Sequence, residues 1–137
     1  MPDGIKIGEL AAECGVSRDT IRFYEREGLL PRPRRTSSGH RSYDSKAINR
    51  LRFIRGARRL GLTLVDIGEL LRLRERRGAE ASRQISRRLR VRAEAIDAEI
   101  GRLHLFRELL GECVQVCERS PSRAAEILDG LLLREAP

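Results

Sequence analysis

The sequence predicts a mainly α-helical fold, in which a winged helix-turn-helix is followed by a long coiled-coil helix and a short C-terminal helix. Aromatic residues make up only 4% of the 137 residues, which suits helices packed through aliphatic side chains better than a β-sandwich. Apolar residues recur with helical spacing along most of the chain, and over residues 89–117 they recur at every seventh position. This spacing is interrupted in residues 29–43, where Pro31 and Pro33 exclude a helix.

Two short helices separated by a tight turn are expected at the start of the chain. Residues 7–13 form the first, and Cys14-Gly15-Val16 interrupts it. Ser17 is a good N-cap for the second, which should reach Arg26 and bury Ile21 and Phe23. A short helix, a turn containing Gly and a second helix opened by Ser form the helix-turn-helix pattern.

A basic hairpin, or wing, is expected next. Residues 29–43 combine two prolines with several arginines and a Ser-Gly pair that suits a tight turn between short strands. From Asp44 the helical spacing returns and continues on one face to Leu60. Thr63 and Asp66 then resemble a capping box at the start of another helix. We therefore assign residues 1–77 to the first domain.

After Gly78 one long helix is expected from about Ser82 to Glu118, within the second segment, residues 78–118. Its seven-residue repeat forms a coiled-coil seam of Leu89, Ile96, Leu103, Leu110 and Cys117. A long helix with one apolar stripe needs a partner, and a second copy of the chain would supply it in a homodimer. The alternative is that the helix folds back on its own N-terminal domain. Ser120-Pro121 ends this helix, and a short helix from Ala124 to Leu133 lies in the last segment, residues 119–137.

The positive charge is concentrated in the first domain. Residues 1–77 contain 18 Arg and Lys against 10 Asp and Glu, whereas residues 78–137 contain 10 of each. The net charge of +8 therefore comes entirely from the N-terminal part, which favours binding to nucleic acid. Of the 28 basic residues 26 are Arg, and we attribute most of this bias to a GC-rich genome.

Several other classes of protein are excluded. The sequence has no apolar run long enough to span a membrane and no apolar segment typical of a signal peptide, so we expect a cytoplasmic protein without membrane contact. It has no phosphate loop, HExxH motif or plausible nucleophile–base pair, so we do not expect an enzyme. Three cysteines, an odd number, do not suggest a secreted disulfide framework.

Four segments of the sequence together resemble the MerR family of bacterial transcription regulators. They are Ile7–Ala11, Thr20–Leu29, Gly39–Tyr43 and Leu51–Arg55, and the likeness spans about the first 75 residues. The resemblance implies a dimer joined by antiparallel long helices and bound to double-stranded promoter DNA. It also implies that the bound effector makes the dimer distort the promoter, so that RNA polymerase can engage two elements that are otherwise too far apart.

Eight residues of the helix-turn-helix and wing are expected to contact DNA: Ser17, Arg18, Thr20, Arg22, Tyr24, Arg35, Arg41 and Tyr43. Arg18 and Arg22 face outward on the second helix, where a guanidinium can bind guanine edges or phosphates. The two hydroxyl residues at the start of that helix can donate hydrogen bonds to phosphates. The resemblance assigns Tyr24 and the three wing residues to the DNA backbone. For any single arginine, the alternative is a solvated surface position.

Cys113 and Cys117 are the candidate effector site. Metal-sensing members of the resembled family carry two cysteines about eight residues apart just after the long helix. Cys117 stands at the first of these positions, but the second falls on Ala125. Family members that sense divalent ions carry a further cysteine at the start of the long helix, whereas members that sense monovalent copper-group ions tend to have Ser there. This chain has Ser82 at that position.

The two cysteines nevertheless form a pair, because residues four apart face the same side of a helix. Soft thiolates so placed could hold a thiophilic ion of the copper(I) group, mercury or a similar metal. The same thiols could instead sense redox state or an electrophile, or serve only in packing. Two other classes remain: an architectural DNA-binding protein without an effector, and a cysteine-dependent enzyme or metal-storage protein, against which the concentrated N-terminal charge argues. We interpret Cys14 as structural and His104 as a surface residue.

Overall fold

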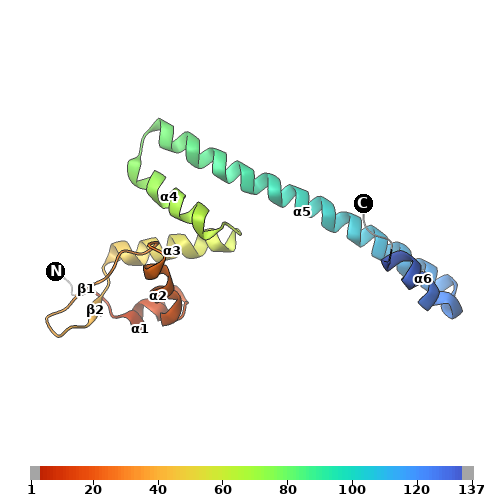
Figure 1. Ribbon diagram of the computed structural model, residues 1–137, viewed down its shortest axis with the longest axis horizontal. Coiled ribbons are helices and arrows are strands. Elements are labelled where there is room, and N and C mark those ends of the chain that lie inside the picture. Colours follow the sequence, from red (N-terminus) through yellow and green to blue (C-terminus); the bar gives the residue numbers. More distant parts are fainter. Residues whose placement is uncertain (1–3, 134–137) are drawn as a thin grey trace. The chain divides into compact units, whose positions relative to one another are not determined.

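The computed structural model describes residues 4–133, and the fold is mainly α-helical, with the expected helix-turn-helix and one long helix (Figure 1). Residues 1–3 and 134–137, which the expected first and last domains include, lie outside this range. The chain divides into two units, one ending at Leu89 and the other beginning at Arg90. The long helix α5 (Ala79–Arg119) contributes to both units.

The helix-turn-helix opens the first unit. Helix α1 (Ile7–Cys14) ends at Gly15, which has a left-handed backbone with φ of 61°, a conformation that favours glycine. Helix α2 (Arg18–Arg26) begins after Ser17, whose Oγ accepts a hydrogen bond from the backbone N–H of Thr20 at 3.0 Å. The predicted N-cap is therefore confirmed.

The wing is a two-stranded antiparallel hairpin of β1 (Arg34–Arg35) and β2 (Arg41–Ser42). Gly39 lies in its turn with φ of 79°, as a tight turn requires. On the far side of β2, Ile5 pairs with Tyr43 through two backbone hydrogen bonds of 3.0 Å. The segment before α1 is thus joined to the base of the wing.

Two further helices complete the first unit, α3 (Ser45–Arg59) and α4 (Leu64–Arg76). The predicted capping box of Thr63 and Asp66 is confirmed at the start of α4. Leu60, to which the apolar face was expected to continue, is the C-cap of α3 and is 60% exposed, and Leu62 is buried instead.

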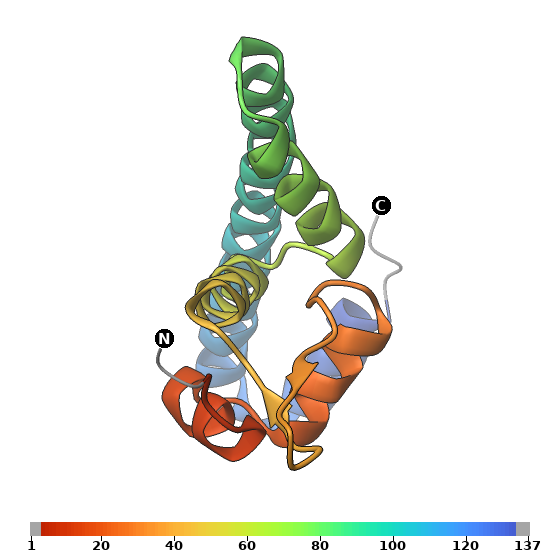
Figure 2. The same ribbon diagram turned by 90° about the vertical axis from the view of Figure 1, so that its left-hand side faces the viewer.

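The core of the first unit is built from all four short helices, the base of the wing and the loop before it. Its largest buried side chains include Leu10, Ile21, Leu29, Leu30, Tyr43, Leu51, Ile54, Ile67 and Leu70. The burial expected for Phe23 is wrong, since Phe23 is 37% exposed and Tyr24 is buried instead. Residues three apart on a helix share a face, so Tyr24 continues the buried stripe of Ile21 and Phe23 does not. Figure 2 shows α1, α2 and the wing at one end of this unit.

The second unit contains the rest of α5, a 3-10 turn (Pro121–Arg123) and helix α6 (Ala124–Leu132). Helix α5 is slightly longer than predicted at both ends, and α6 ends one residue earlier than predicted. Leu89, Ile96, Leu103 and Leu110 of the predicted seam are 39–60% exposed in the single chain. None of the helices within residues 4–133 has the length and apolar character that crossing a membrane requires.

Candidate nucleic-acid interface

Arg18 and Arg22 are exposed on α2, as expected. Arg22 forms an ion pair with Asp19 one turn earlier, with a distance of 3.3 Å between nitrogen and oxygen. The guanidinium of Arg18 lies against Gly8 of α1, where an added Cβ would stand only 2.8 Å from its Nη2. The small residue at position 8 therefore makes room for Arg18 beside the start of α1.

Ser17 and Thr20 lie together at the start of α2, with 2.8 Å between their side-chain oxygens. The Ser17 oxygen already accepts the capping hydrogen bond of the helix. The positive end of the helix dipole is at this turn and favours an anion such as a phosphate. A phosphate contact from either hydroxyl remains a prediction.

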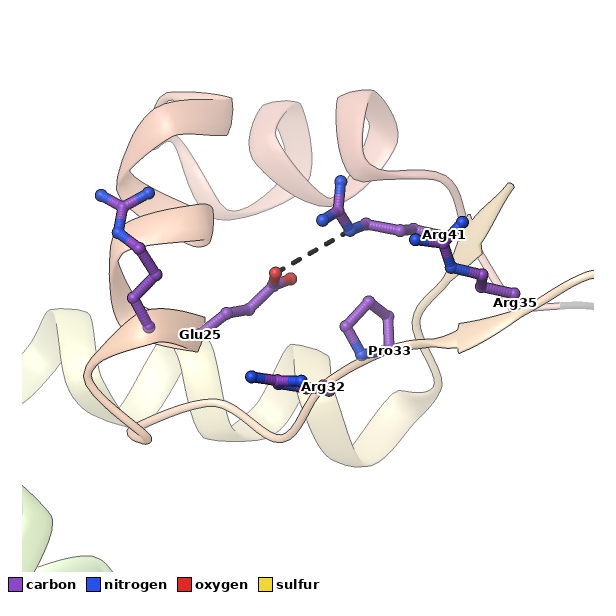
Figure 3. A pocket seen from close by; sticks show the side chains of 6 residues that line it. Glu25, Arg32, Pro33, Arg35 and Arg41 are labelled. Carbon is purple, nitrogen blue, oxygen red and sulfur yellow. Dashed lines mark ion pairs between the residues drawn. The ribbon is translucent and has the colours of Figure 1, made fainter. Parts of the chain in front are cut away.

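A pocket between α2 and the wing is lined mainly by arginines (Figure 3). Its lining consists of Glu25, Arg26, Arg32, Pro33, Arg35 and Arg41. Arg35 and Arg41 face each other across the hairpin as register partners. Arg26, the last residue of α2, and Arg32, in the loop that follows, were not among the predicted contacts, because the sequence does not show the path of that loop.

A second hollow lies on the other side of Arg41. It is lined by Lys6, Ile7, Gly8, Glu9, Arg18, His40 and Arg41. Arg41 belongs to both hollows, so basic side chains extend from the start of α1, past the wing, to the end of α2. A surface of this kind suits a chain of phosphates.

Tyr43 occupies a position different from the one predicted. Its side chain is only 2% exposed, and its hydroxyl donates a hydrogen bond of 2.5 Å to Oε1 of Glu25. Burial, together with the hydrogen bond to the carboxylate, raises the pKa of Tyr43 far above its ordinary value. Little of the Tyr43 side chain is therefore left for DNA, so its DNA contact stays a prediction, and Tyr43 supports the wing from inside.

Tyr24 is also buried, with its ring beside that of Phe23 and 5.7 Å between the two centroids. Only a small part of its surface is left for DNA, so its contact with the backbone stays a prediction.

Glu25 was missed by the sequence analysis although a signal was present. It follows Ile21 by four residues, on the buried side of α2, where a carboxylate needs a partner. Its side chain is 9% exposed, and its second oxygen lies 3.9 Å from Nε of Arg41. One carboxylate thus contacts both the surface residue Arg41 of β2 and the core residue Tyr43 that follows this strand.

The two candidate effector cysteines are on α5, within the second unit. Cys113 is buried and Cys117, one turn later, is half-buried; both are free thiols. Within residues 4–133, His, Cys, Asp and Glu do not gather in any group of three or more that could hold a metal ion. Two thiols alone suit a soft ion that accepts two ligands, and they do not suit an ion that needs four. Ser82 is exposed near the start of α5, and Ala125 lies on α6.

Comparison with known proteins gives consistent matches. Residues 5–73 match the profile described as MerR HTH family regulatory protein, and residues 48–113 match one described as MerR, DNA binding. A mercuric resistance operon regulatory protein of Bacillus cereus is 52% identical over 66 residues. That match covers 48% of this chain and 50% of the relative, so the chain spans about half the length of that relative.

Two further matches extend over most of the chain. The ZntR homolog of Haemophilus influenzae, an HTH-type transcriptional regulator, is 34% identical over 128 residues, which are 93% of this chain and 92% of the relative. A lead(II)-bound transcription regulator of Ralstonia metallidurans has a similar structure, with a TM-score of 0.69 and 32% identity. The structural match covers 81% of this chain and 86% of the other.

Proposed function

Because this chain belongs to the MerR family of helix-turn-helix regulatory proteins, we propose that it is a dimeric, sequence-specific transcription regulator of the cytoplasm that acts on promoter DNA. The observation that carries this proposal is the basic surface formed by α1, α2 and the wing. The relatives are named as regulators, and none of the names indicates an enzyme.

The two parts of this surface, α2 and the wing, would contact DNA in different ways. A helix of the size of α2 fits the major groove, where Arg18 and Arg22 can bind guanine edges in the bidentate manner of a guanidinium. The wing carries Arg35 and Arg41 to the phosphates beside the groove, where they would fix position without reading sequence.

Dimerisation would be provided by α5. Four leucine and isoleucine side chains spaced seven residues apart are 39–60% exposed in the single chain, and a second copy would bury them. Two copies related by a twofold axis would present two α2 helices to two half-sites of one promoter.

The effector we propose is a thiophilic metal ion held by Cys113 and Cys117. The family context supports a metal, since relatives are named for mercuric resistance or bind lead(II). The bound ion would supply a link between two thiolates near the end of α5. The ion-bound dimer would distort the promoter and the ion-free dimer would not, so that the ion shifts an equilibrium between two states of the dimer. RNA polymerase would respond to the distorted promoter.

Nuclease footprinting of the full chain on the DNA upstream of its own gene tests the main proposal. We expect one protected site made of two related half-sites, and strong preference for it over random DNA of equal length. Equal affinity for the two DNAs over a range of salt concentrations would contradict sequence-specific binding.

A further inference from the structure

The contacts of Glu25 join α2 to the wing. Oε1 accepts the hydrogen bond of the buried Tyr43 hydroxyl, and Oε2 faces Nε of Arg41. These two residues flank Ser42 at the end of β2, so both contacts act on the same short strand. Figure 3 shows the Glu25 side chain pointing from α2 across the pocket to Arg41.

The two contacts differ in strength. The contact with Tyr43 is short and buried, and hydrogen bonds from a neutral donor to a carboxylate are among the stronger ones in proteins. The contact with Arg41 is 3.9 Å long, and the Arg41 side chain is 43% exposed against 9% for Glu25. An ion pair that is partly exposed and long contributes little energy, so Arg41 can leave it easily while Glu25 stays in place.

The surroundings of Arg41 favour its transfer to a phosphate. Arg26, Arg32 and Arg35 line the same pocket, and Glu25 is its one acidic lining residue. A phosphate of DNA entering there would meet four guanidinium groups and one carboxylate. That carboxylate attracts Arg41 in the free protein and repels the phosphate in the complex.

We propose that Glu25 is a positioning residue that fixes the wing to α2 through Tyr43, and that Arg41 exchanges its ion pair with Glu25 for one with a DNA phosphate. The inference rests on the proposed function, since the phosphate is that of bound DNA. The Glu25 carboxylate thus has two roles: it anchors the wing through Tyr43, and it competes weakly with a DNA phosphate for Arg41.

Three substitutions separate these roles. In Glu25→Gln the amide oxygen can still accept the Tyr43 hydrogen bond, but the negative charge is gone. In Glu25→Ala both contacts are gone, and in Tyr43→Phe only the anchoring hydrogen bond is lost. Glu27→Gln and Glu27→Ala are matched controls, because Glu27 is exposed at the end of the same helix.

Anchoring is measured without DNA. Limited trypsin digestion, followed by mass spectrometry, reports the rate of cleavage after Arg35 and Arg41 relative to sites on α5. We expect both wing sites to be cut several-fold faster in Glu25→Ala and Tyr43→Phe, and at the wild-type rate in Glu25→Gln and the controls. Wild-type rates in both Glu25→Ala and Tyr43→Phe would overturn the anchoring role. Because Tyr43→Phe keeps the ring in the core, its cleavage rates still test the anchoring role if Glu25→Ala fails to fold.

The transfer of Arg41 from Glu25 to a DNA phosphate is tested by measuring the affinity of each variant for duplex DNA of random sequence. We expect Glu25→Gln to bind roughly two- to fivefold more tightly than the wild type, because a weak competing ion pair is removed. We expect Glu25→Ala to bind about tenfold more weakly or worse, because the wing is released. Equal weakening in Glu25→Gln and Glu25→Ala would overturn the exchange. If no variant binds DNA, the proposed function fails, while the cleavage rates still decide the anchoring role.

Discussion

The guanidinium of Arg55 on α3 donates a hydrogen bond of 2.5 Å to the backbone carbonyl of Cys14, the last residue of α1. Carbonyls at the end of a helix have no partner within it, so this contact satisfies one of them. Gly15 makes the approach possible, since an added Cβ would stand 2.8 Å from Nη1 of Arg55. Arg55 thus joins α3 to the turn of the helix-turn-helix.

Loss of this contact should destabilise the first unit. We expect Arg55→Ala to lower the free energy of unfolding by about 1–2 kcal/mol, since a hydrogen bond from a charged donor to a part-buried carbonyl is removed. Urea denaturation at one fixed protein concentration measures the change. Arg59→Ala, an exposed substitution on the same helix, is the control. Equal effects of the two substitutions would show that the contact does not stabilise the fold.

The DNA-binding surface should separate into residues that read bases and residues that bind phosphates. If Arg18 or Arg22 contacts a base edge, its replacement by Ala should cost about 1–3 kcal/mol of binding and relax the preference at one operator position. Arg41→Ala should weaken binding to all sequences alike and reduce the salt slope by about one. Titrations with operator and random DNA at several salt concentrations measure both. Equal losses on the two DNAs for Arg18→Ala and Arg22→Ala would place the recognition surface elsewhere.

Features fixed by neighbouring residues could be predicted from the sequence. The N-cap of Ser17 and the capping box of Thr63 depend only on residues within one helical turn, and both were found as predicted. Contacts between distant side chains could not be predicted. Tyr43 was assigned to the DNA backbone from the family resemblance, but its side chain is buried and its hydroxyl bonds to Glu25, 18 residues earlier in the chain. The contact of Arg55 with α1 spans 41 residues and leaves no local pattern.

The seam on α5 should hold the proposed dimer together. Leu103→Glu places a carboxylate among apolar side chains, which costs several kcal/mol and should dissociate the dimer. Ile96→Glu should do the same. Leu105→Glu is the matched control, because Leu105 is 51% exposed against 53% for Leu103 but lies on the opposite side of the helix. Light scattering measures the mass of each variant. A dimer mass for both seam variants would contradict pairing through this face.

Burial of the Tyr43 hydroxyl predicts a loss of stability in alkali. The pKa of Tyr43 is raised in the folded protein, so the fold favours the neutral phenol. The associated stability is fully present below the unfolded pKa of about 10 and is lost as the pH rises above it, by up to about 1.4 kcal/mol per pH unit. We expect the free energy of unfolding to fall less steeply above pH 10 in Tyr43→Phe than in the wild type. Parallel pH profiles for the two proteins would contradict this role of the hydroxyl.

The reactivity of the cysteines should follow their burial. Cys14 and Cys113 are buried and Cys117 is half-buried, and burial also raises the pKa of the Cys14 thiol. Because the thiolate is the reactive form, we expect Cys117 to be alkylated first at neutral pH and Cys14 last in the metal-free protein. Mass spectrometry of the alkylated peptides gives the order. A thiophilic ion bound by the pair should protect Cys113 and Cys117 together and leave the rate at Cys14 unchanged.

Substitution of the pair then tests whether these thiols carry the signal. We expect Cys113→Ser and Cys117→Ser each to abolish induction of a promoter reporter by copper(I)-group or mercury ions, because a single thiolate binds such ions too weakly to shift the dimer. Operator affinity should stay within a few-fold, since both states of the dimer bind DNA. Cys14→Ala is the control and should keep induction. Induction by oxidants alone, lost in the same Ser variants, would replace the metal by a redox signal. Full induction in the double Ser variant would remove both thiols from the mechanism.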